Sequence, residues 1–172
     1  MRLASTLPIA AVLALVAACD EDRPQPLPVA PLAVAPNSVS AYVAVSNSTP
    51  AAGTEVTVWV RARRGAAVGP IGSFTIRLAY DSTRLHFKDA ARSEQGMVLA
   101  NGANAGMVIA AGASADGFKN DELLAATFVA TSANALAELT LTVTELNTVK
   151  FEDQKANMRV ERALYRGTPA TK

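Results

Sequence analysis

From residue 39 onward, hydrophobic and polar side chains alternate in short runs, which glycine, asparagine, aspartate and proline separate. The run 54–61 is the clearest case, with Val56, Val58 and Val60 at every second position. A period of two is typical of a β-strand with one buried face, because successive side chains of a strand point to opposite sides. Apolar residues at helical spacing after a strong N-cap are lacking in this part of the chain. We therefore predict an all-β domain.

This part of the chain contains about nine runs of this kind, and each predicts one strand. They span residues 39–45, 54–61, 73–80, 84–88, 96–100, 106–111, 122–131, 138–145 and 159–165. The turn-forming Asn101-Gly102 lies between the fifth and the sixth run, which predicts a hairpin. The run 122–131 is apolar on both faces, as expected of a central strand. Nine short strands without a long helix favour two packed sheets.

A proline-rich segment precedes the first strand, with prolines at positions 24, 26, 28, 31 and 36. Proline fixes φ and lacks a backbone donor, so this segment should favour extended polyproline II over helix or sheet. At about 3.1 Å per residue, it could hold the domain up to roughly 50 Å from its attachment point. We therefore predict a tether at 19–38, the sandwich at 39–166 and a flexible tail at 167–172. The alternative is that apolar residues of the tether pack along the edge of the domain.

Residues 1–18 have the pattern of a secretory signal peptide, because Arg2 supplies a positive charge and residues 3–18 are almost wholly apolar. The apolar stretch is short for a membrane-spanning helix, which needs about 20 residues, and Pro8 would disturb one. Val16-Ala17-Ala18-Cys19 resembles the bacterial lipobox, in which the cysteine thiol receives diacylglycerol before cleavage. The resemblance implies a mature chain that starts at Cys19, the only cysteine. The alternative is that ordinary signal peptidase cuts nearby and that Cys19 is incidental.

Lipidation at Cys19 would fix the exported protein to a membrane of the bacterial cell envelope. Each buried CH₂ group contributes on the order of 0.8 kcal/mol, so two or three acyl chains would hold the protein there for long periods. Asp20, next to the lipidated residue, resembles an inner-membrane retention signal of enterobacteria. Other bacterial groups follow different rules, so the inner and the outer membrane both stay open.

Length and charge limit the classes of function that the chain can serve. Its 172 residues suffice for one ordinary globular domain with some extra segments. The 16 basic and 15 acidic side chains nearly balance, which argues against a nucleic-acid partner. The densest basic stretch, Arg61, Arg63 and Arg64, is interpreted as the end of a strand that enters a loop. With one cysteine no internal disulfide can form, so the domain must depend on its hydrophobic core.

The segment 72–87, Gly-Ser-Phe-Thr-Ile-Arg-Leu-Ala-Tyr-Asp-Ser-Thr-Arg-Leu-His-Phe, resembles the most recognisable stretch of cohesin-type domains. In those domains a strand ends in Tyr-Asp, a tight turn follows, and a Leu-x-Phe or Leu-x-Val strand begins. Here the carboxylate of Asp81 can accept the backbone N–H groups of that turn. The likeness extends over residues 39–166 and implies a nine-stranded jelly-roll β-sandwich of the cohesin and carbohydrate-binding-module type.

The same resemblance implies a binding function. Cohesin domains bind the calcium-loaded dockerin of a partner protein. The outward positions Thr75, Arg77 and Ala79 correspond to a strand that cohesins use for binding. An Asp-rich calcium loop is lacking from this sequence, so the chain contains no dockerin of its own.

Residues that catalysis or a metal would need are sparse. Catalysis usually requires a nucleophile with a base, paired carboxylates or a metal cluster. The only histidine, His86, falls on the outward face of a predicted strand. We therefore predict that the protein is not an enzyme and has no cofactor. Asp116, Asp121 and Glu122 gather around the Gly117 loop and could place oxygens about a calcium ion, although a polar turn is the simpler interpretation.

The single tryptophan is the candidate for carbohydrate binding. Trp59 falls on the face of its strand opposite to Val58 and Val60, and an outward indole could stack on pyranose rings. Carbohydrate sites typically use several aromatic residues, so a packing contact of Trp59 is the alternative.

Three functional hypotheses follow from these features. The first is a non-catalytic envelope lipoprotein whose cohesin-like domain binds an unidentified protein through a sheet face or its loops. The second is a carbohydrate-binding lipoprotein with a polysaccharide ligand. The third is a structural envelope component without a discrete ligand site.

Overall fold

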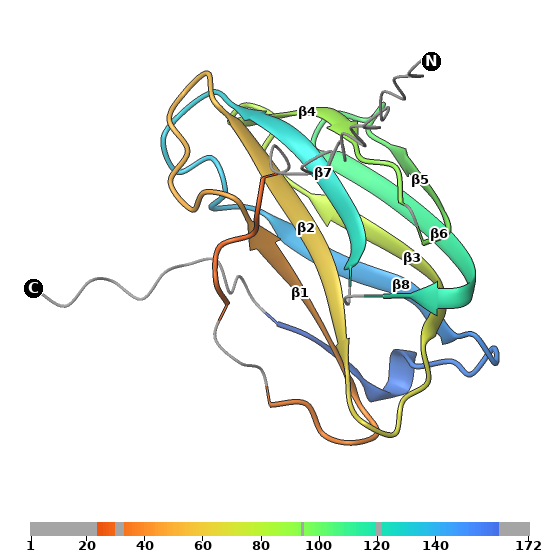
Figure 1. Ribbon diagram of the computed structural model, residues 1–172. Helices are drawn as coiled ribbons and strands as arrows, with labels where there is room; N and C mark the ends of the chain where they lie inside the picture. Colours follow the sequence, from red (N-terminus) through yellow and green to blue (C-terminus); the bar gives the residue numbers. More distant parts are fainter. Residues whose placement is uncertain (1–23, 30–32, 94, 120–121, 162–172) are drawn as a thin grey trace, which may run out of the picture.

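The computed structural model describes residues 24–29, 33–93, 95–119 and 122–161. Nine strands and one short 3₁₀ helix, η1 (Lys155–Asn157), form this part of the chain. The strands lie in two sheets that pack face to face (Figure 1), which confirms the predicted all-β sandwich. No helix in these ranges is long and apolar enough to cross a membrane. The predicted signal peptide, Cys19 and the C-terminal tail lie outside the described residues.

The first sheet has five strands in the order β4-β7-β2-β1-β9. Their bounds are β1 (Val39–Val45), β2 (Glu55–Arg64), β4 (Leu85–Ala90), β7 (Glu122–Ala130) and β9 (Met158–Val160). Neighbouring strands are antiparallel, except that β9 runs parallel to β1. β7 lies between β4 and β2, which confirms the central strand predicted from its two apolar faces.

The second sheet has four strands in the order β5-β6-β3-β8. Their bounds are β3 (Ile71–Ala79), β5 (Met97–Asn101), β6 (Met107–Phe118) and β8 (Thr140–Thr148). All neighbours in this sheet are antiparallel. β5 and β6 form the hairpin that the sequence predicts.

The hydrophobic core lies between the two sheets and uses the alternating positions that define the strands. Its fully buried members include Val56, Val58 and Val60 from β2 and Phe74, Ile76 and Leu78 from β3. Burial of one such side chain stabilises the fold by about 1.5–3 kcal/mol. The rings of Tyr80 and Phe128 meet edge to face, with their centroids 5.2 Å apart. The core therefore joins residues from both sheets, as the period of two requires.

β6 is longer than the sequence predicts. We expected this strand to end at residue 111, whereas it continues to Phe118. Its second half contains Gly112, which lies just beyond the predicted end of the strand. A Cβ atom at this position would come within 2.5 Å of the ring of Phe74. Glycine is therefore required here by close packing against the core and does not mark a turn.

The turn between β3 and β4 carries the chain from one sheet to the other. Asp81 Oδ1 accepts hydrogen bonds from the Thr83 backbone N–H at 2.8 Å and from the Thr83 hydroxyl at 2.6 Å. Arg84 Nε lies 3.1 Å from the second carboxylate oxygen. The hydrogen bond from the Thr83 hydroxyl, followed by that from the Thr83 N–H, lowers the pKa of Asp81. The predicted role of Asp81 in the turn is confirmed.

The described part of the proline-rich segment packs on the domain. We name residues 24–29 the strap. The Leu27 N–H donates to the Val45 carbonyl oxygen at 2.8 Å, and Val29 packs against Trp59 and its neighbours. Closer to β1, the Ala67 N–H donates to the Pro36 carbonyl oxygen at 2.9 Å. The prediction of a free, extended tether is therefore wrong for these residues, and the alternative of packing on the domain is correct. The physical reason is an apolar cluster on the outer face of the five-stranded sheet, formed by Tyr42, Ala44, Trp59 and Ala125, against which Val29 packs.

Candidate binding face on the four-stranded sheet

The outer face of the four-stranded sheet carries the predicted binding positions. Because Phe74, Ile76 and Leu78 point into the core, their neighbours in β3 point outward. Arg77 is exposed, and Thr75 and Ala79 are half-buried. The structure therefore brings all three predicted residues onto one face of the molecule.

Strand pairing adds neighbours on both sides of β3. Thr75 lies opposite Ala111 of β6 and Glu145 of β8. Ala111 in turn lies opposite Leu99 of β5. Leu99, Ala111, Thr75 and Glu145 therefore form one row across the sheet. The next row contains Asn101, Ile109, Arg77 and Thr142.

A β-bulge decides that Glu145 belongs to this face. Leu141 and Val143 point inward, so strict alternation would send Glu145 inward as well. The pairing of β8 with β3 shifts between Thr75 and Ile76, which leaves one extra residue in β8. Glu145 consequently points to solvent and Leu146 is fully buried. Glu145 was not predicted from the sequence, because a bulge has no signature in the alternation itself.

Glu145 is held by three side-chain donors. Asn147 Nδ2 lies 2.8 Å from Glu145 Oε1 and also 3.1 Å from the Ser73 hydroxyl oxygen. The hydroxyl of Ser73 donates to Oε1 at 3.3 Å, and that of Thr75 donates to Oε2 at 3.2 Å. These bonds fix a negative charge in the polar half of the face, formed by β3 and β8.

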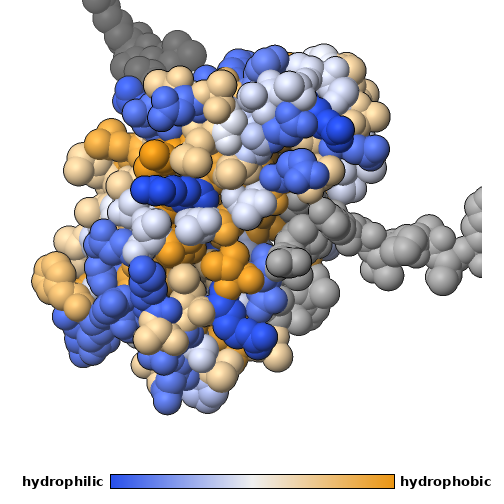
Figure 2. All heavy atoms as spheres, turned by 180° about the vertical axis from the view of Figure 1, so that it is seen from behind, coloured by the Kyte–Doolittle hydropathy of each residue, from blue (hydrophilic) through white to orange (hydrophobic). Residues whose placement is uncertain are grey.

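The other half of the face, formed by β5 and β6, is apolar. Met97 and Leu99 on β5 are 65% and 67% exposed, and the outward positions Ala111 and Ala113 on β6 are also exposed. Figure 2 views the molecule from this side and shows apolar residues in several groups, with hydrophilic ones between and around them. Large apolar side chains that remain exposed side by side are typical of an interaction surface.

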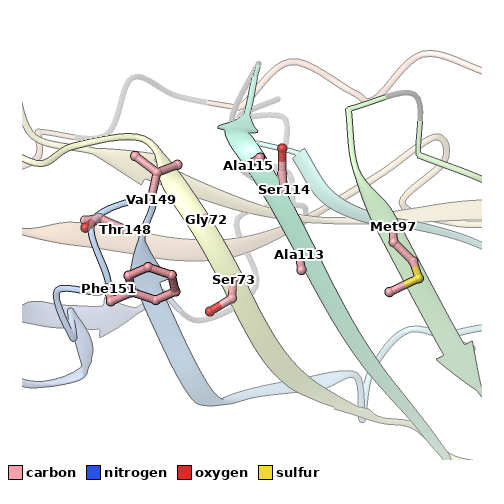
Figure 3. Close-up of a pocket in the computed structure, with 9 residues that line it drawn as sticks. All are labelled: Gly72, Ser73, Met97, Ala113, Ser114, Ala115, Thr148, Val149 and Phe151. Atoms are coloured by element: carbon pink, nitrogen blue, oxygen red, sulfur yellow. The ribbon is translucent and has the colours of Figure 1, made fainter.

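A shallow hollow of about 330 Å³ lies at one end of this face (Figure 3). Its lining consists of Gly72, Ser73, Met97, Ala113, Ser114, Ala115, Thr148, Val149 and Phe151. In the close-up, Phe151 stands on one side of the hollow and Met97 on the other, with Ser73 and Ala113 between them. The hollow extends the apolar half of the face toward the loop that follows β8.

Phe151 projects into solvent from a strained turn. Its side chain is 89% exposed and its φ is 63°, which is a rare conformation for a bulky residue. The Phe151 N–H donates to the Thr148 carbonyl oxygen at 2.9 Å. The Thr148 hydroxyl accepts the N–H groups of Lys150 and Glu152 at 3.2 and 3.3 Å. The exposure of Phe151 was not predictable from the sequence, because an isolated phenylalanine between charged residues indicates neither burial nor exposure.

Trp59 lies on the other sheet and does not present its ring to solvent. It points away from the main core, as predicted, but it is only 2% exposed. Tyr42, Ala44 and Ala125 surround it, and Val29 of the strap packs against this cluster. The prediction of an outward, accessible indole is therefore wrong, and the alternative, a packing contact of Trp59, is correct. Val29 of the strap contributes to this burial by packing against the cluster.

The remaining candidates do not converge on a site within the described ranges. Asp116 is exposed near the end of β6, Glu122 begins β7, and Asp121 lies outside the described residues. No group of three or more potential metal ligands occurs among the described residues. His86 is exposed on β4, in the other sheet. The calcium interpretation stays a prediction.

Three solved structures have a similar arrangement of strands. A non-cellulosomal cohesin from the hyperthermophilic archaeon Archaeoglobus fulgidus is 14% identical, with a TM-score of 0.53 over 72% of this chain and 86% of that chain. A chain of a type II cohesin-X-dockerin complex from Acetivibrio cellulolyticus is 10% identical, with a TM-score of 0.56 over 72% and 95%. Type II cohesin A11 from Bacteroides cellulosolvens is 13% identical, with a TM-score of 0.52 over 71% and 95%. No family model and no curated protein matches the sequence.

Two packed sheets of five and four strands define an antiparallel-rich β-sandwich, in which the Trp59 cluster on one outer face is buried and Met97 and Leu99 on the other are exposed. The solved structures that resemble it are cohesin modules, so the chain has a cohesin-like fold. The resemblance of residues 72–87 to cohesin-type domains predicted this fold, and the prediction is confirmed.

Proposed function

We propose that this protein is a bacterial envelope lipoprotein, anchored through lipid on Cys19, whose non-catalytic cohesin-like domain binds another protein. The binding surface is the outer face of the four-stranded sheet. The observation that carries the proposal is the exposure of Met97 and Leu99 beside a carboxylate, Glu145, that three donors hold in place. The cohesin-like fold supports a binding module rather than an enzyme.

The dimensions of the face suit a helix of a partner protein. Neighbouring strands lie about 4.8 Å apart, so the row from Leu99 to Glu145 spans about 14 Å. A helix with its side chains is about 10–12 Å across. Such a helix would place apolar side chains over Leu99 and Ala111 and a basic or amide side chain beside Glu145. Because the carboxylate is already oriented, the pairing would require little reordering of this protein.

Known complexes of similar structures favour a protein partner. One similar structure is the sixth cohesin of Acetivibrio cellulolyticus scaffoldin B in complex with a Cel5 dockerin, and it is 12% identical to this chain. We extend to this chain only the class of partner, a protein, and leave its identity to experiment. The carbohydrate alternative loses the residue on which it depended, because Trp59 is buried.

Site-specific photo-crosslinking in the native envelope tests the binding face. A photoreactive amino acid replaces Arg77 on the open face, and a matched control replaces His86, which is exposed on the other sheet. We expect one defined protein adduct from position 77 and none of that mass from position 86. Adducts of equal yield from both positions, or no adduct from position 77, would contradict the proposed face.

Affinity for the captured partner measures the contribution of the apolar half. We expect Leu99→Asp to weaken binding at least tenfold, about 1.4 kcal/mol, because it places a charge against the partner's apolar side chains. His86→Asp adds the same charge on the other sheet and should leave the affinity unchanged. Equal losses in both variants would point to a general charge effect and not to this face.

The anchor is tested separately. Cys19→Ser removes the only thiol that can carry diacylglycerol. We expect the variant to leave the membrane fraction and the native protein to carry acyl chains that mass spectrometry detects. A native chain without acyl mass would overturn the anchor but not the binding face.

A further inference from the structure

The strap binds to the part of the β1 edge that β9 leaves unpaired. β9 pairs with Val39, Ser40 and Ala41, the first residues of β1. At the other end of the same strand, the Val45 carbonyl oxygen accepts the Leu27 N–H at 2.8 Å. Figure 1 shows the strap running across this end of β1, on the side of the molecule opposite to the four-stranded sheet.

The spacing of its prolines lets the strap donate backbone hydrogen bonds to one side only. Residues 24, 26 and 28 are prolines, so only residues 25, 27 and 29 carry N–H groups. In an extended chain, the N–H groups of alternate residues point to the same side. The strap therefore donates toward β1 and offers no donor on its outer side, as is usual for proline at a sheet edge. It closes this edge of the sheet to further strands.

Val29 joins the strap to the only tryptophan of the chain. Tyr42 and Trp59 are each 2% exposed, and Val29 packs against the cluster that they form with Ala44 and Ala125. The strap is thus attached by a backbone hydrogen bond and by an apolar contact two residues later. The hydrogen bond lies at the edge of the five-stranded sheet and the apolar contact on its outer face.

We propose that the docked strap holds the outer face of the five-stranded sheet toward the lipid surface and turns the four-stranded face away from it. The inference rests on the lipid anchor of the proposed function. Cys19 precedes Leu27 by eight residues, which reach about 25 Å as polyproline II. Without docking, the 20 residues from Cys19 to Val39 would reach about 62 Å and would let the domain rotate freely. Docking therefore shortens the connection and fixes the side from which it leaves the domain.

Intrinsic fluorescence reports whether the strap is docked, because Trp59 is the only tryptophan. Val29→Asp places a charge against the Trp59 cluster and should undock the strap. We expect its emission to shift to longer wavelength and acrylamide to quench it more strongly. Pro24→Asp adds the same charge at an exposed strap position and should leave the spectrum unchanged.

Energy transfer to a headgroup acceptor measures the orientation of the full-length lipidated chain in vesicles of phosphatidylethanolamine and phosphatidylglycerol. Cys19 is acylated, so Thr49→Cys or Thr142→Cys supplies the only free thiol for a donor dye. Thr49 lies in the loop after β1, four residues beyond Val45, which accepts the hydrogen bond of the strap, and Thr142 lies on the four-stranded face; both are exposed. We expect higher transfer from position 49 than from position 142, and loss of this difference in Val29→Asp but not in Pro24→Asp.

The outcomes separate this inference from the proposed anchor. Equal transfer from both positions in the acylated, vesicle-bound protein would overturn the orientation and leave the anchor intact. A difference that persists in Val29→Asp, although Trp59 has become accessible, would overturn the role of the strap. A chain that carries no acyl group and stays off the vesicles would overturn the anchor and the orientation with it.

Discussion

On the outer face of the five-stranded sheet, the aromatic side chains of Tyr42 and Trp59 are each 2% exposed, whereas Met97 and Leu99 on the outer face of the four-stranded sheet are 65% and 67% exposed. Tyr42 and Trp59 lie on the neighbouring strands β1 and β2, Met97 and Leu99 lie at alternate positions of β5, and both pairs point away from the main core. Val29 of the strap packs against the cluster of the first pair, whereas Met97 and Leu99 remain mostly exposed. Alternation thus decides which side of a sheet a residue occupies, but the segments that lie over the sheet decide whether it meets water.

The difference also separates stability from binding. Apolar side chains on the covered face are part of the folded structure and should contribute to its free energy of unfolding. Apolar side chains on the open face contribute little until a partner covers them. Substitutions of apolar residues on the covered face should therefore lower the free energy of unfolding, whereas those on the open face should weaken binding and leave the free energy of unfolding nearly unchanged.

The largest effect on stability is expected from Trp59→Ala. Truncation of a buried tryptophan leaves a cavity and should lower the free energy of unfolding by about 3–5 kcal/mol. Leu99→Ala on the open face should change it by less than about 0.5 kcal/mol. Urea unfolding of the two variants measures both values. A similar loss in both variants would remove the distinction between the covered and the open face.

A smaller loss of stability is expected from Gly65→Ala, which tests how the segment before β1 packs on the domain. A Cβ atom at Gly65 would meet the backbone oxygen atoms of Ala35 and Pro36 at 2.0 and 2.4 Å. Because backbone must move to relieve this overlap, we expect a loss of about 1–3 kcal/mol. Gly69→Ala is the matched control, since its nearest contacts are at an ordinary 3.7 Å. Thermal and urea unfolding that rank Gly69→Ala as the more harmful change would contradict this packing.

Leu27→Pro addresses the hydrogen bond of the strap alone. The substitution removes the N–H that donates to Val45 and should cost about 0.5–1.5 kcal/mol. Leu27→Ala keeps this N–H and changes only a side chain that is 36% exposed, so its cost should be smaller. Hydrogen exchange and urea unfolding compare the two variants. If alanine costs as much as proline, the side chain and not the hydrogen bond attaches the strap.

The smallest effect concerns Asp81, in the turn that joins the two sheets. Its pKa in the folded protein is lowered from 3.8, first by the Thr83 hydroxyl, then by the Thr83 N–H and by Arg84. A carboxyl group with a lowered folded-state pKa stabilises the fold above its ordinary pKa, and this contribution is lost as the pH falls through the folded value. We expect Asp81→Asn to be less stable than the native protein near neutral pH, with a difference that shrinks below about pH 4. Urea midpoints across that range measure it, and a difference that grows with acidity would contradict the assignment.

Prediction from the sequence succeeded where structure depends on neighbouring residues. The alternation at Val56, Val58 and Val60 and the turn at Asp81 arise within a few residues of the chain, so local patterns encode them. Thr75, Arg77 and Ala79 point outward, as the alternation predicts, for the same reason. Prediction failed at Glu145, because the direction of its side chain depends on a bulge. It also failed at the second half of β6, where Gly112 leaves room for the ring of Phe74.

The sequence by itself determined two packed sheets and the residues that face their common core, because a period of two has only one stable burial pattern. It did not determine which outer face is open. That depends on Val29 meeting Trp59 and on Leu27 meeting Val45, contacts between residues that are far apart in the chain. Tertiary structure decided it, because an apolar side chain at an outward position is buried only when another segment reaches it and excludes water.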